Sequence, residues 1–366
     1  MSLFPSMSLV TLSSIRDAAK RISSIARRTP VLDVSDLAGR PLFLKCEPQQ
    51  PGGAFKIRGA TNMLKRLPAD ALTRGVITYS SGNHGQAVAL AASRLGAPAV
   101  IVMPTTAPPI KIAGVKRWGA EVVLEGTTSL DRRRRAEAIA KARGLTMVPP
   151  FDHEWIIEGQ GTCGLEILEQ VPGVDIVVVP VGGGGLVSGV AAAIKLSRPS
   201  GAHERSGASE SPRATGASRG AGGPDDQTRR GAEVPDDQTK VIGVEPAGAA
   251  KMSASLAAGH PVTLEKTESI ADGLMPVRPG DLTFAHVKAF VDQMVTVEDA
   301  NIARAALWLF HEAKQVVEPS GAATVAATLW PTEGSLLADK SATVVAILSG
   351  GNVAPETLAA LANPTS

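Results

Sequence analysis

The stretch Pro180-Val181-Gly182-Gly183-Gly184-Gly185-Leu186 joins two segments of different periodicity. Residues 175–181 form a short, valine-rich apolar run, which is typical of a strand buried on both faces. Residues 186–196 follow with the spacing of a helix. Four glycines between such a strand and helix place consecutive backbone N–H groups at the helix N-terminus, where they can bind a phosphate. The stretch therefore predicts an α/β fold with an anion site.

The same alternation of strand and helix extends over most of the chain. Strands are expected at residues 41–45, 76–79, 99–103, 121–124, 240–245 and 343–348. Helices are expected at residues 13–28, with Ser13 or Ser14 as the cap, and at 56–67, 86–95, 110–118, 129–143, 161–171, 299–314 and 321–329. Alternation with short loops indicates parallel strands covered by helices. We therefore expect an α/β protein with open, twisted, mostly parallel sheets flanked by helices.

Composition limits the partners and the location of the protein. The 366 residues suffice for two domains, and a net charge of +2 gives no reason to expect nucleic acid or an acidic membrane as a partner. The run Arg132–Arg135 is flanked by acids, which favours a solvated helix face over a nucleic-acid site. The sequence has no apolar run of membrane-spanning length and no secretion-signal pattern at its N-terminus. With the widely separated Cys46 and Cys163, this indicates a reducing, cytoplasmic location.

Residues 199–239 break the alternating pattern. They are rich in Gly, Ser, Ala, Pro and Arg, and the sequence Pro-Asp-Asp-Gln-Thr at 224–228 recurs at 235–239. A segment with almost no large apolar side chains cannot bury enough surface to offset its ordering entropy. We therefore expect a disordered surface insertion between a helix and the next strand.

Three further stretches carry side chains suited to chemistry, although each alone also fits a structural turn or a surface helix. Lys56 follows Phe55 at the start of a helix, and a lysine in a partly desolvated pocket has a lowered pKa and can attack a carbonyl. Residues 80–85, Ser-Ser-Gly-Asn-His-Gly, follow a strand and open a helix, which makes an anion site that suits a carboxylate. Ser349 ends the last strand, at the sheet edge where ligands bind in open α/β folds.

The glycine loop also overlaps the GxGxxG pattern of dinucleotide-binding proteins, which makes an NAD-dependent oxidoreductase the alternative enzyme class. Ser188 stands in place of the last glycine, and the acid expected about twenty residues further on would fall in the insertion. A Walker loop is excluded because no lysine follows the glycines. The alternative outside enzymes is a protein that only binds an amino acid or a pyridoxal cofactor.

In their order and context, these stretches resemble the fold type II family of pyridoxal-phosphate (PLP) enzymes, with the tryptophan synthase β-like fold. Within that family the chain is similar to the threonine/serine dehydratase and serine racemase group. The resemblance covers residues 10–198 and 240–355. The motifs that carry it are Ala54–Ala60, Ser80–Gln86, Gly159–Thr162, Gly182–Gly185 and Ser349–Asn352.

The resemblance implies a role for each of these residues. Lys56 would form a Schiff base with PLP and, once displaced by the substrate, would remove the α-proton. Phe55 and Asn83 would contact the cofactor ring, Asn83 at its phenolic oxygen. The loop Gly182, Gly183, Gly184 and Gly185 would hold the phosphate, and Ser349 would pair with the ring nitrogen. The substrate carboxylate would bind to Ser80, Ser81, Gly82, Asn83 and His84, with His84 as a hydrogen-bonding residue rather than a base.

The implied activity is β-elimination from L-threonine or L-serine, which yields a 2-oxo acid and ammonia. A serine partner for the ring nitrogen, Ser349, leaves the ring less fully protonated, and this favours elimination. Ser81 permits an alternative, because a serine at this position in racemases of the group faces the ring from the side opposite the lysine. Serine racemisation and 3-hydroxyaspartate dehydration therefore stay open as alternative activities.

The resemblance also implies where a cation would bind. The group often binds a cation through a glutamate, a carbonyl and a second acid, which correspond to Glu245, Ala249 and position 251. Lys251 replaces the acid, which argues against a divalent cation. Lys251 either pairs with Glu245 in place of the metal or is exposed to solvent.

The expected large domain comprises residues 1–70 and 152–366, and the expected small domain comprises residues 71–151. The expected assembly is a homodimer.

Overall fold

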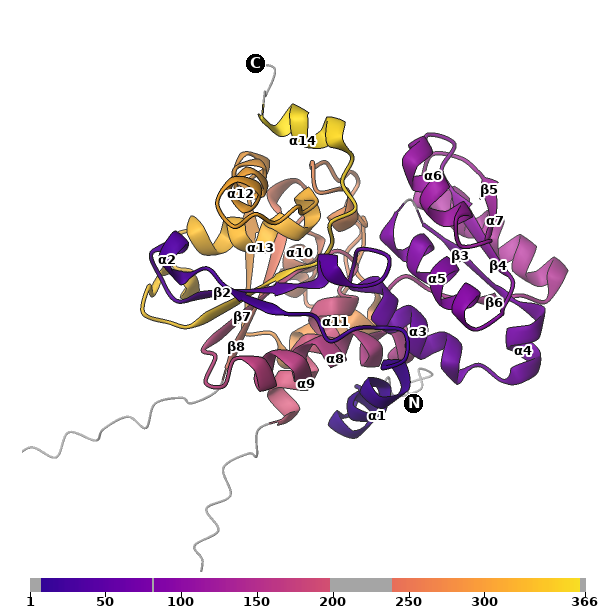
Figure 1. The fold of residues 1–366 in the computed structure, drawn as a ribbon, viewed down its shortest axis with the longest axis horizontal. Helices are drawn as coiled ribbons and strands as arrows, with labels where there is room; N and C mark the ends of the chain where they lie inside the picture. Colours follow the sequence, from indigo (N-terminus) through magenta and orange to yellow (C-terminus); the bar gives the residue numbers. More distant parts are fainter. Residues whose placement is uncertain (1–7, 81, 198–238, 363–366) are drawn as a thin grey trace, which may run out of the picture.

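The computed structural model describes residues 8–80, 82–197 and 239–362, whose strands form two sheets (Figure 1). The larger sheet has the order β1-β2-β10-β7-β8-β9 and the smaller one the order β5-β4-β3-β6. The larger sheet contains β1 Val31–Asp33, β2 Leu42–Cys46, β7 Ile176–Pro180, β8 Lys240–Pro246, β9 Gln293–Val297 and β10 Val344–Leu348. The smaller contains β3 Val76–Tyr79, β4 Ala99–Met103, β5 Glu121–Leu124 and β6 Thr146–Met147. Every pair is parallel except β1 with β2, so the predicted fold class is confirmed.

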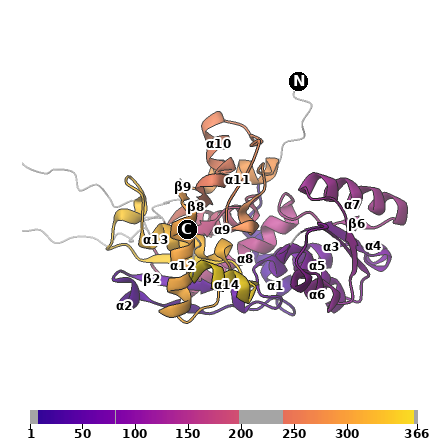
Figure 2. The same ribbon diagram turned by 90° about the horizontal axis from the view of Figure 1, so that it is seen from above.

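Helices cover these sheets, and the smaller sheet with its helices lies to one side of the larger (Figures 1 and 2). The first helices are α1 Leu12–Ile22, α2 Ser35–Ala38, α3 Lys56–Arg66, α4 Ala69–Arg74, α5 Asn83–Arg94, α6 Pro109–Lys116 and α7 Ser129–Arg143. The later ones are α8 Glu154–Gln170, α9 Gly185–Ser197, α10 Lys251–Ala258, α11 Asp281–Phe290, α12 Asp299–His311, α13 Pro319–Leu329 and α14 Pro355–Ala362.

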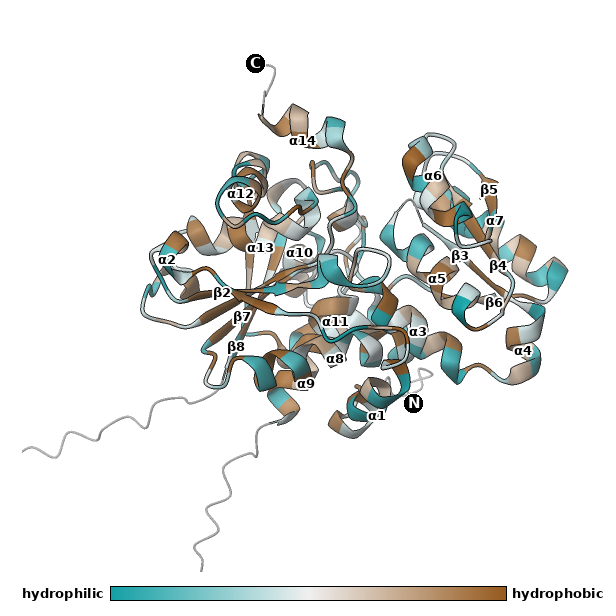
Figure 3. Cartoon of the chain, in the orientation of Figure 1, coloured by the Kyte–Doolittle hydropathy of each residue, from teal (hydrophilic) through white to brown (hydrophobic). Residues whose placement is uncertain are grey.

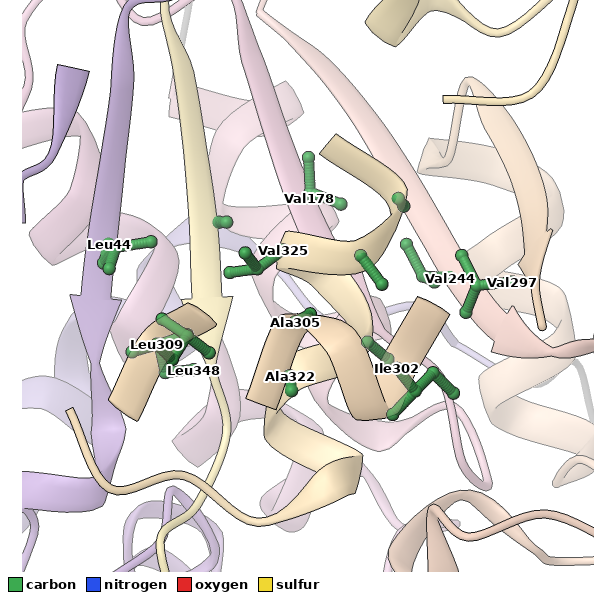
Figure 4. Close-up of a cluster of buried hydrophobic side chains, with 14 of the residues drawn as sticks. Leu44, Val178, Val244, Val297, Ile302, Ala305, Leu309, Ala322, Val325 and Leu348 are labelled. Atoms are coloured by element: carbon green, nitrogen blue, oxygen red, sulfur yellow. The ribbon is translucent and has the colours of Figure 1, made fainter. Parts of the chain in front are cut away.

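The central strands of the larger sheet, β2, β10, β7 and β8, are buried on both faces, as their apolar sequences require. The strands β2, β7 and β8 are hydrophobic over most of their length (Figure 3). On one face, side chains of α12 and α13 such as Ile302, Leu309 and Val325 pack against Leu44 and Val178 (Figure 4). On the other face, apolar side chains of α8, α9 and α11 form a second cluster with β7 and β10. The loops at the carboxyl ends of the strands are therefore carried by a rigid layer.

Helix α3 connects the two sheets, because it packs against α8 and also against α5. Glycines permit this close packing: a Cβ on Gly159 of α8 would lie 2.6 Å from the Cα of Gly59. All strands of the smaller sheet fall between Val76 and Met147. On this basis we propose that residues 71–151 form a small domain and that residues 1–70 and 152–366 belong to a large one.

Several expected boundaries were wrong. The first helix ends at Ile22 rather than near residue 28, and its cap is Thr11, whose hydroxyl accepts the Ser14 N–H at 3.1 Å. Helix α5 begins at Asn83 instead of Gln86, and α8 begins at Glu154, seven residues before the expected start. Strands β1, β6 and β9 were not expected at all. These strands are short or carry polar side chains, so their patterns do not stand out from loops.

The arginine run on α7 and the end of the insertion differ in part from what the sequence predicts. Arg133, Arg134 and Arg135 are exposed, as expected, but Arg132 is buried, and its guanidinium donates to the carbonyl of Thr127 at 3.1 Å. Residues 199–238 of the expected insertion lie outside the described residues. Its last residue, Thr239, is buried, and its hydroxyl donates to the carbonyl of Val174 at 2.8 Å. In the described ranges we find no helix that is long and apolar enough to cross a membrane.

Candidate active site

Two of the predicted stretches, residues 52–59 and 349–352, meet where β10 ends. Ala54 and Gly350 form a β-bridge, and the N–H of Phe55 donates to the carbonyl of Ser349 at 3.0 Å. The N–H of Gly351 donates to the carbonyl of Gly53 at 2.9 Å. Ser349 is buried at this junction. The structure therefore places Ser349 directly beside the segment that carries Lys56.

Asn83, the first residue of α5, connects this junction to the third stretch. The Asn352 amide donates to the Asn83 side-chain oxygen at 2.9 Å and to the carbonyl of Gly52 at 2.8 Å. The Asn83 amide donates to Oε1 of Glu318 at 2.6 Å. Asn83 is thus held between the end of β10 and the start of α13, with its orientation set from both sides.

Glu318 is a residue of the site that sequence reasoning missed. It precedes Pro319 at the start of α13, and it is buried. Burial raises the pKa of the Glu318 carboxyl to about 7, and the charge of Asp272 adds to this effect. The signal that the sequence offers is an acid directly before Pro-Ser-Gly, which also fits an ordinary helix start. A carboxyl with such a pKa holds Asn83 and stays partly protonated at neutral pH.

Lys56 is the first residue of α3, and its side chain is only partly exposed. The ammonium donates to the carbonyl of Pro150 at 2.9 Å and lies 5.0 Å from the centre of the Phe55 ring. Burial lowers the pKa of Lys56 to about 8. A lysine with this pKa has a substantial neutral fraction near pH 8 and can act as a nucleophile and as a base.

The glycine loop lies against Phe151, the residue that follows Pro150. A Cβ on Gly183 would lie 2.3 Å from Cδ1 of Phe151, and one on Gly185 would lie 3.0 Å from Cβ of Phe151. Gly184 has a φ of 97°, in the region that favours glycine. The Thr283 hydroxyl donates to the carbonyl of Gly183 at 2.7 Å. Side chains at these positions would therefore fill or distort the loop.

The residues present fit PLP. The loop opens α9 at Gly185, so its backbone N–H groups and the helix dipole provide an anion cradle for a phosphate. A nucleophilic lysine, Lys56, stands close by, since both it and the loop contact the segment Pro150–Phe151. Phe151 and Thr283 were not expected from the sequence, because nothing in their own surroundings marks them.

The proposed carboxylate loop is only partly described, because Ser81 lies outside the described residues. The N–H of Gly82 donates to the hydroxyl of Ser80 at 3.1 Å. His84 is buried in α5, and its Nε2–H donates to the carbonyl of Val148 at 3.1 Å. Burial, with a smaller effect of the Lys56 charge, lowers the pKa of His84 to about 3. His84 is therefore neutral and serves as a hydrogen-bonding residue of the helix.

The expected remnant of a cation site is occupied by Lys251. Its ammonium lies 3.1 Å from Oε1 of Glu245, and both side chains are fully buried. Of the two alternatives for Lys251, the structure therefore has the ion pair and not the exposed side chain. Within the described part of the chain, no group of three or more His, Cys, Asp or Glu residues could hold a metal ion.

Known proteins share both the sequence and the fold. The sequence pattern of the family "Pyridoxal-phosphate dependent enzyme" matches residues 22–350. An L-threonine ammonia-lyase of Thermotoga maritima is 39% identical over 348 residues, which cover 94% of this chain and 76% of that protein. A serine racemase of Oryza sativa subsp. indica is 38% identical over 346 residues, 93% of this chain and 91% of that protein. The structure of maize serine racemase has a TM-score of 0.82 at 36% identity and covers 96% of either chain. The chain belongs to the family of pyridoxal-phosphate dependent enzymes.

Proposed function

We propose that this enzyme uses PLP to eliminate the β-hydroxyl of L-threonine or L-serine, which gives a 2-oxo acid and ammonia. The observation that carries the proposal is the placement of Lys56. Its partly buried amine, with a pKa near 8, contacts the same Pro150–Phe151 segment as the glycine loop. The names of the relatives, an ammonia-lyase and serine racemases, support this class of reaction. They give no support to the NAD-dependent alternative.

Each residue of the site has a proposed task. Lys56 would hold the cofactor covalently, the N–H groups of Gly182–Gly185 would bind its phosphate, and Ser349 would pair with its ring nitrogen. Phe55 would contact the ring and Asn83 its phenolic oxygen. The substrate carboxylate binds to Ser80, Ser81, Gly82, Asn83 and His84 at the start of α5.

The chain's own residues then move one proton. When bound, PLP withdraws electrons from the α-carbon of the amino acid. Once the substrate amine has displaced it, the amine of Lys56 would accept the α-proton, and its pKa near 8 suits a base that works near neutral pH. The α-proton and the β-hydroxyl leave the substrate as one water in the overall balance. One water then hydrolyses the resulting enamine to the 2-oxo acid and ammonia.

Serine racemisation is the second candidate, because the relatives from Oryza sativa subsp. indica and maize are serine racemases. Ser81 is the proposed second base, which would deliver a proton to the face opposite Lys56. 3-Hydroxyaspartate is a further candidate substrate of the elimination.

An assay of four amino acids separates these activities. Purified enzyme with PLP is incubated with L-threonine, L-serine, D-serine and 3-hydroxyaspartate, and 2-oxo acid release is measured together with the chirality of the remaining substrate. We expect 2-oxo acids from L-threonine and L-serine. Change of chirality without any 2-oxo acid would establish racemisation instead, and neither product from any substrate would refute the proposal.

The pH dependence of cofactor binding follows from the pKa of Lys56. Only the neutral amine attacks the PLP aldehyde, so lowering its pKa from 10.5 to about 8 moves the reactive form to lower pH. The rate at which apoprotein combines with PLP should rise about tenfold per pH unit below pH 8 and level off above it. Stopped-flow absorbance measures this rate. A rate that keeps rising up to pH 10 would contradict the lowered pKa.

Replacing Gly183 with alanine is expected to weaken PLP binding by about 1–3 kcal/mol, the usual range for overpacking. The new methyl group would lie 2.3–2.4 Å from three ring atoms of Phe151, so the ring or the loop must shift. Equilibrium titration with PLP measures the effect. Gly96→Ala is the control, because no heavy atom lies within 4 Å of its added Cβ. Its φ of 68° makes alanine unfavourable for the fold, so this control should lower the melting temperature but leave PLP affinity unchanged. Equal PLP affinities of the two variants would contradict a role of Gly183 in the cradle.

We further propose a homodimer in a reducing cytoplasm. The family resemblance supports the dimer, and the two cysteines, Cys46 and Cys163, are free and buried, which suits a reducing compartment. Analytical ultracentrifugation tests the dimer, and a monomer at micromolar concentration would contradict it.

A further inference from the structure

A single buried ammonium lies behind the glycine loop. Lys251 is the first residue of α10 and is fully buried. Its Nζ lies 2.7 Å from the carbonyl oxygen of Val181, 3.0 Å from that of Leu274 and 3.1 Å from that of Ala249. With Oε1 of Glu245 at 3.1 Å, four oxygens surround the ammonium. The three donors of a lysine are thus fully used.

The counter-charge is held in place independently of the lysine. Oε1 of Glu245 accepts the N–H of Met252 at 2.8 Å. Oε2 accepts the N–H of Ser253 at 2.9 Å and its hydroxyl at 2.8 Å. Glu245 therefore caps α10, and the buried pair is neutral as a whole. A buried charge is tolerated only with such compensation.

The oxygens around Lys251 come from segments that form the glycine loop and its support. Val181 directly precedes Gly182, and the carbonyl of Gly273, next to Leu274, lies 2.8 Å from where a Cβ of Gly182 would be. The side-chain methyl group of Met252, the residue after Lys251, lies 2.9 Å from where a Cβ of Gly184 would be. The ammonium therefore fixes the entry of the loop to its neighbours.

We propose that Lys251 is a built-in cation that holds the phosphate loop in its binding shape, so that this enzyme requires no divalent cation. A cluster of one carboxylate and three carbonyl oxygens is a donor set that hard cations prefer. Here these oxygens surround the ammonium of Lys251. A divalent ion at this position would be repelled by the positive charge and would lack the second acid as a ligand. The residues present thus do not fit the cation that the sequence resemblance implies. Lys251 is a positioning residue, because it acts on the cofactor through the loop.

The first test uses the wild-type holoenzyme. After dialysis against EDTA, its PLP dissociation constant and melting temperature should be unchanged, and titration with Mn²⁺ followed by electron paramagnetic resonance should show no stoichiometric tight site. Loss of PLP affinity on chelation that Mg²⁺ or Mn²⁺ restores would overturn the proposal. One tightly bound Mn²⁺ per chain would overturn it as well. Neither result depends on which amino acid the enzyme uses.

The second test removes the charge but keeps the length of the side chain. Lys251→Met should weaken PLP binding roughly 10- to 100-fold, as expected when a group that orients ligand contacts is lost. Lys195→Met is the control, because Lys195 is also largely buried and ion-paired, at 2.8 Å from Asp292, but lies near the C-terminal end of α9, away from the loop. The control should lower the melting temperature and leave PLP affinity unchanged. Equal effects of both variants on PLP affinity would contradict a specific role of Lys251.

The third test restores an acid. Lys251→Asp places a second carboxylate beside Glu245 and shortens the side chain, so that a metal ion can enter. In EDTA this variant should bind PLP weakly, and added Mn²⁺ should bind once per chain and recover the affinity. A merely structural role of Lys251 predicts no such rescue. Mn²⁺ binding without recovery, or no Mn²⁺ binding at all, would count against Lys251 as the replacement of a cation.

Discussion

Replacing Lys56 with alanine is expected to lower kcat/KM for 2-oxo acid release by at least about 10⁴-fold, as is usual when a residue central to the chemistry is removed. The variant loses both the covalent attachment of PLP and the base that accepts the α-proton. The purified protein should also lack the absorbance band that borohydride abolishes in the wild type. PLP can still bind through the glycine loop, so the loss should appear in the chemical step more than in phosphate binding.

Lys65→Ala is the matched control for this variant. Lys65 lies on the same helix, and its ammonium donates to the carbonyl of Arg21 at 2.8 Å, on the side of α3 that faces α1. It should retain the absorbance band and most of the activity. If Lys56→Ala kept the band or lost less than about tenfold in kcat/KM, another lysine would have to hold the cofactor.

Replacing Arg58 with methionine is expected to lower the free energy of unfolding by about 3–5 kcal/mol, because it leaves the buried carboxylate of Glu47 without its guanidinium partner. Arg58 is fully buried two residues after Lys56. Its guanidinium donates to both oxygens of Glu47 at 2.8 Å and to those of Glu166 at 2.6 and 2.8 Å. These bonds connect the start of α3 to Glu47, directly after β2, and to Glu166 on α8. Glu47 itself is fully buried, so its charge would be stranded.

Urea denaturation of both proteins measures this difference. Arg133→Met is the control, because its partner Glu137 lies four residues on along an exposed helix face. Such exposed pairs contribute only about 0.3–0.5 kcal/mol. A loss for Arg58→Met as small as that of the control would mean that the network does not stabilise the fold.

The sequence could predict the elements whose ends are marked by residues with strong boundary preferences, such as glycine. The strands at residues 76–79, 99–103 and 121–124 were expected with the bounds that the structure has. The helix at residues 129–143 was also expected with its observed bounds. Gly144 ends it in the left-handed conformation with a φ of 67°. Glycine at such a position is a strong local signal.

Long-range packing explains what could not be predicted. Helix α8 contains Gly159, Gly161 and Gly164, which weaken its helical pattern. The structure shows that α3 and α9 approach at these points: a Cβ on Gly189 of α9 would lie 2.3 Å from the carbonyl of Ile157. Such glycines are required by the neighbouring backbone, which sequence alone does not reveal.

The same limit applies to the site. The four stretches around Lys56, Asn83, Gly182–Gly185 and Ser349 were visible because glycine and polar residues follow buried strands. Glu318 was not, because its function depends on the Asn83 amide, 235 positions away in the sequence and 2.6 Å away in the structure. The Lys251 pair was open to two interpretations until burial was known, since exposure cannot be deduced from a single lysine.

Peptide mapping locates the lysine that holds the cofactor. The purified enzyme is supplied with PLP, reduced with borohydride, digested and mapped by mass spectrometry. We predict a stoichiometric pyridoxyl-phosphate adduct on the peptide that contains Lys56. An adduct on another lysine, or no adduct on cofactor-supplied protein, would contradict the assignment of Lys56.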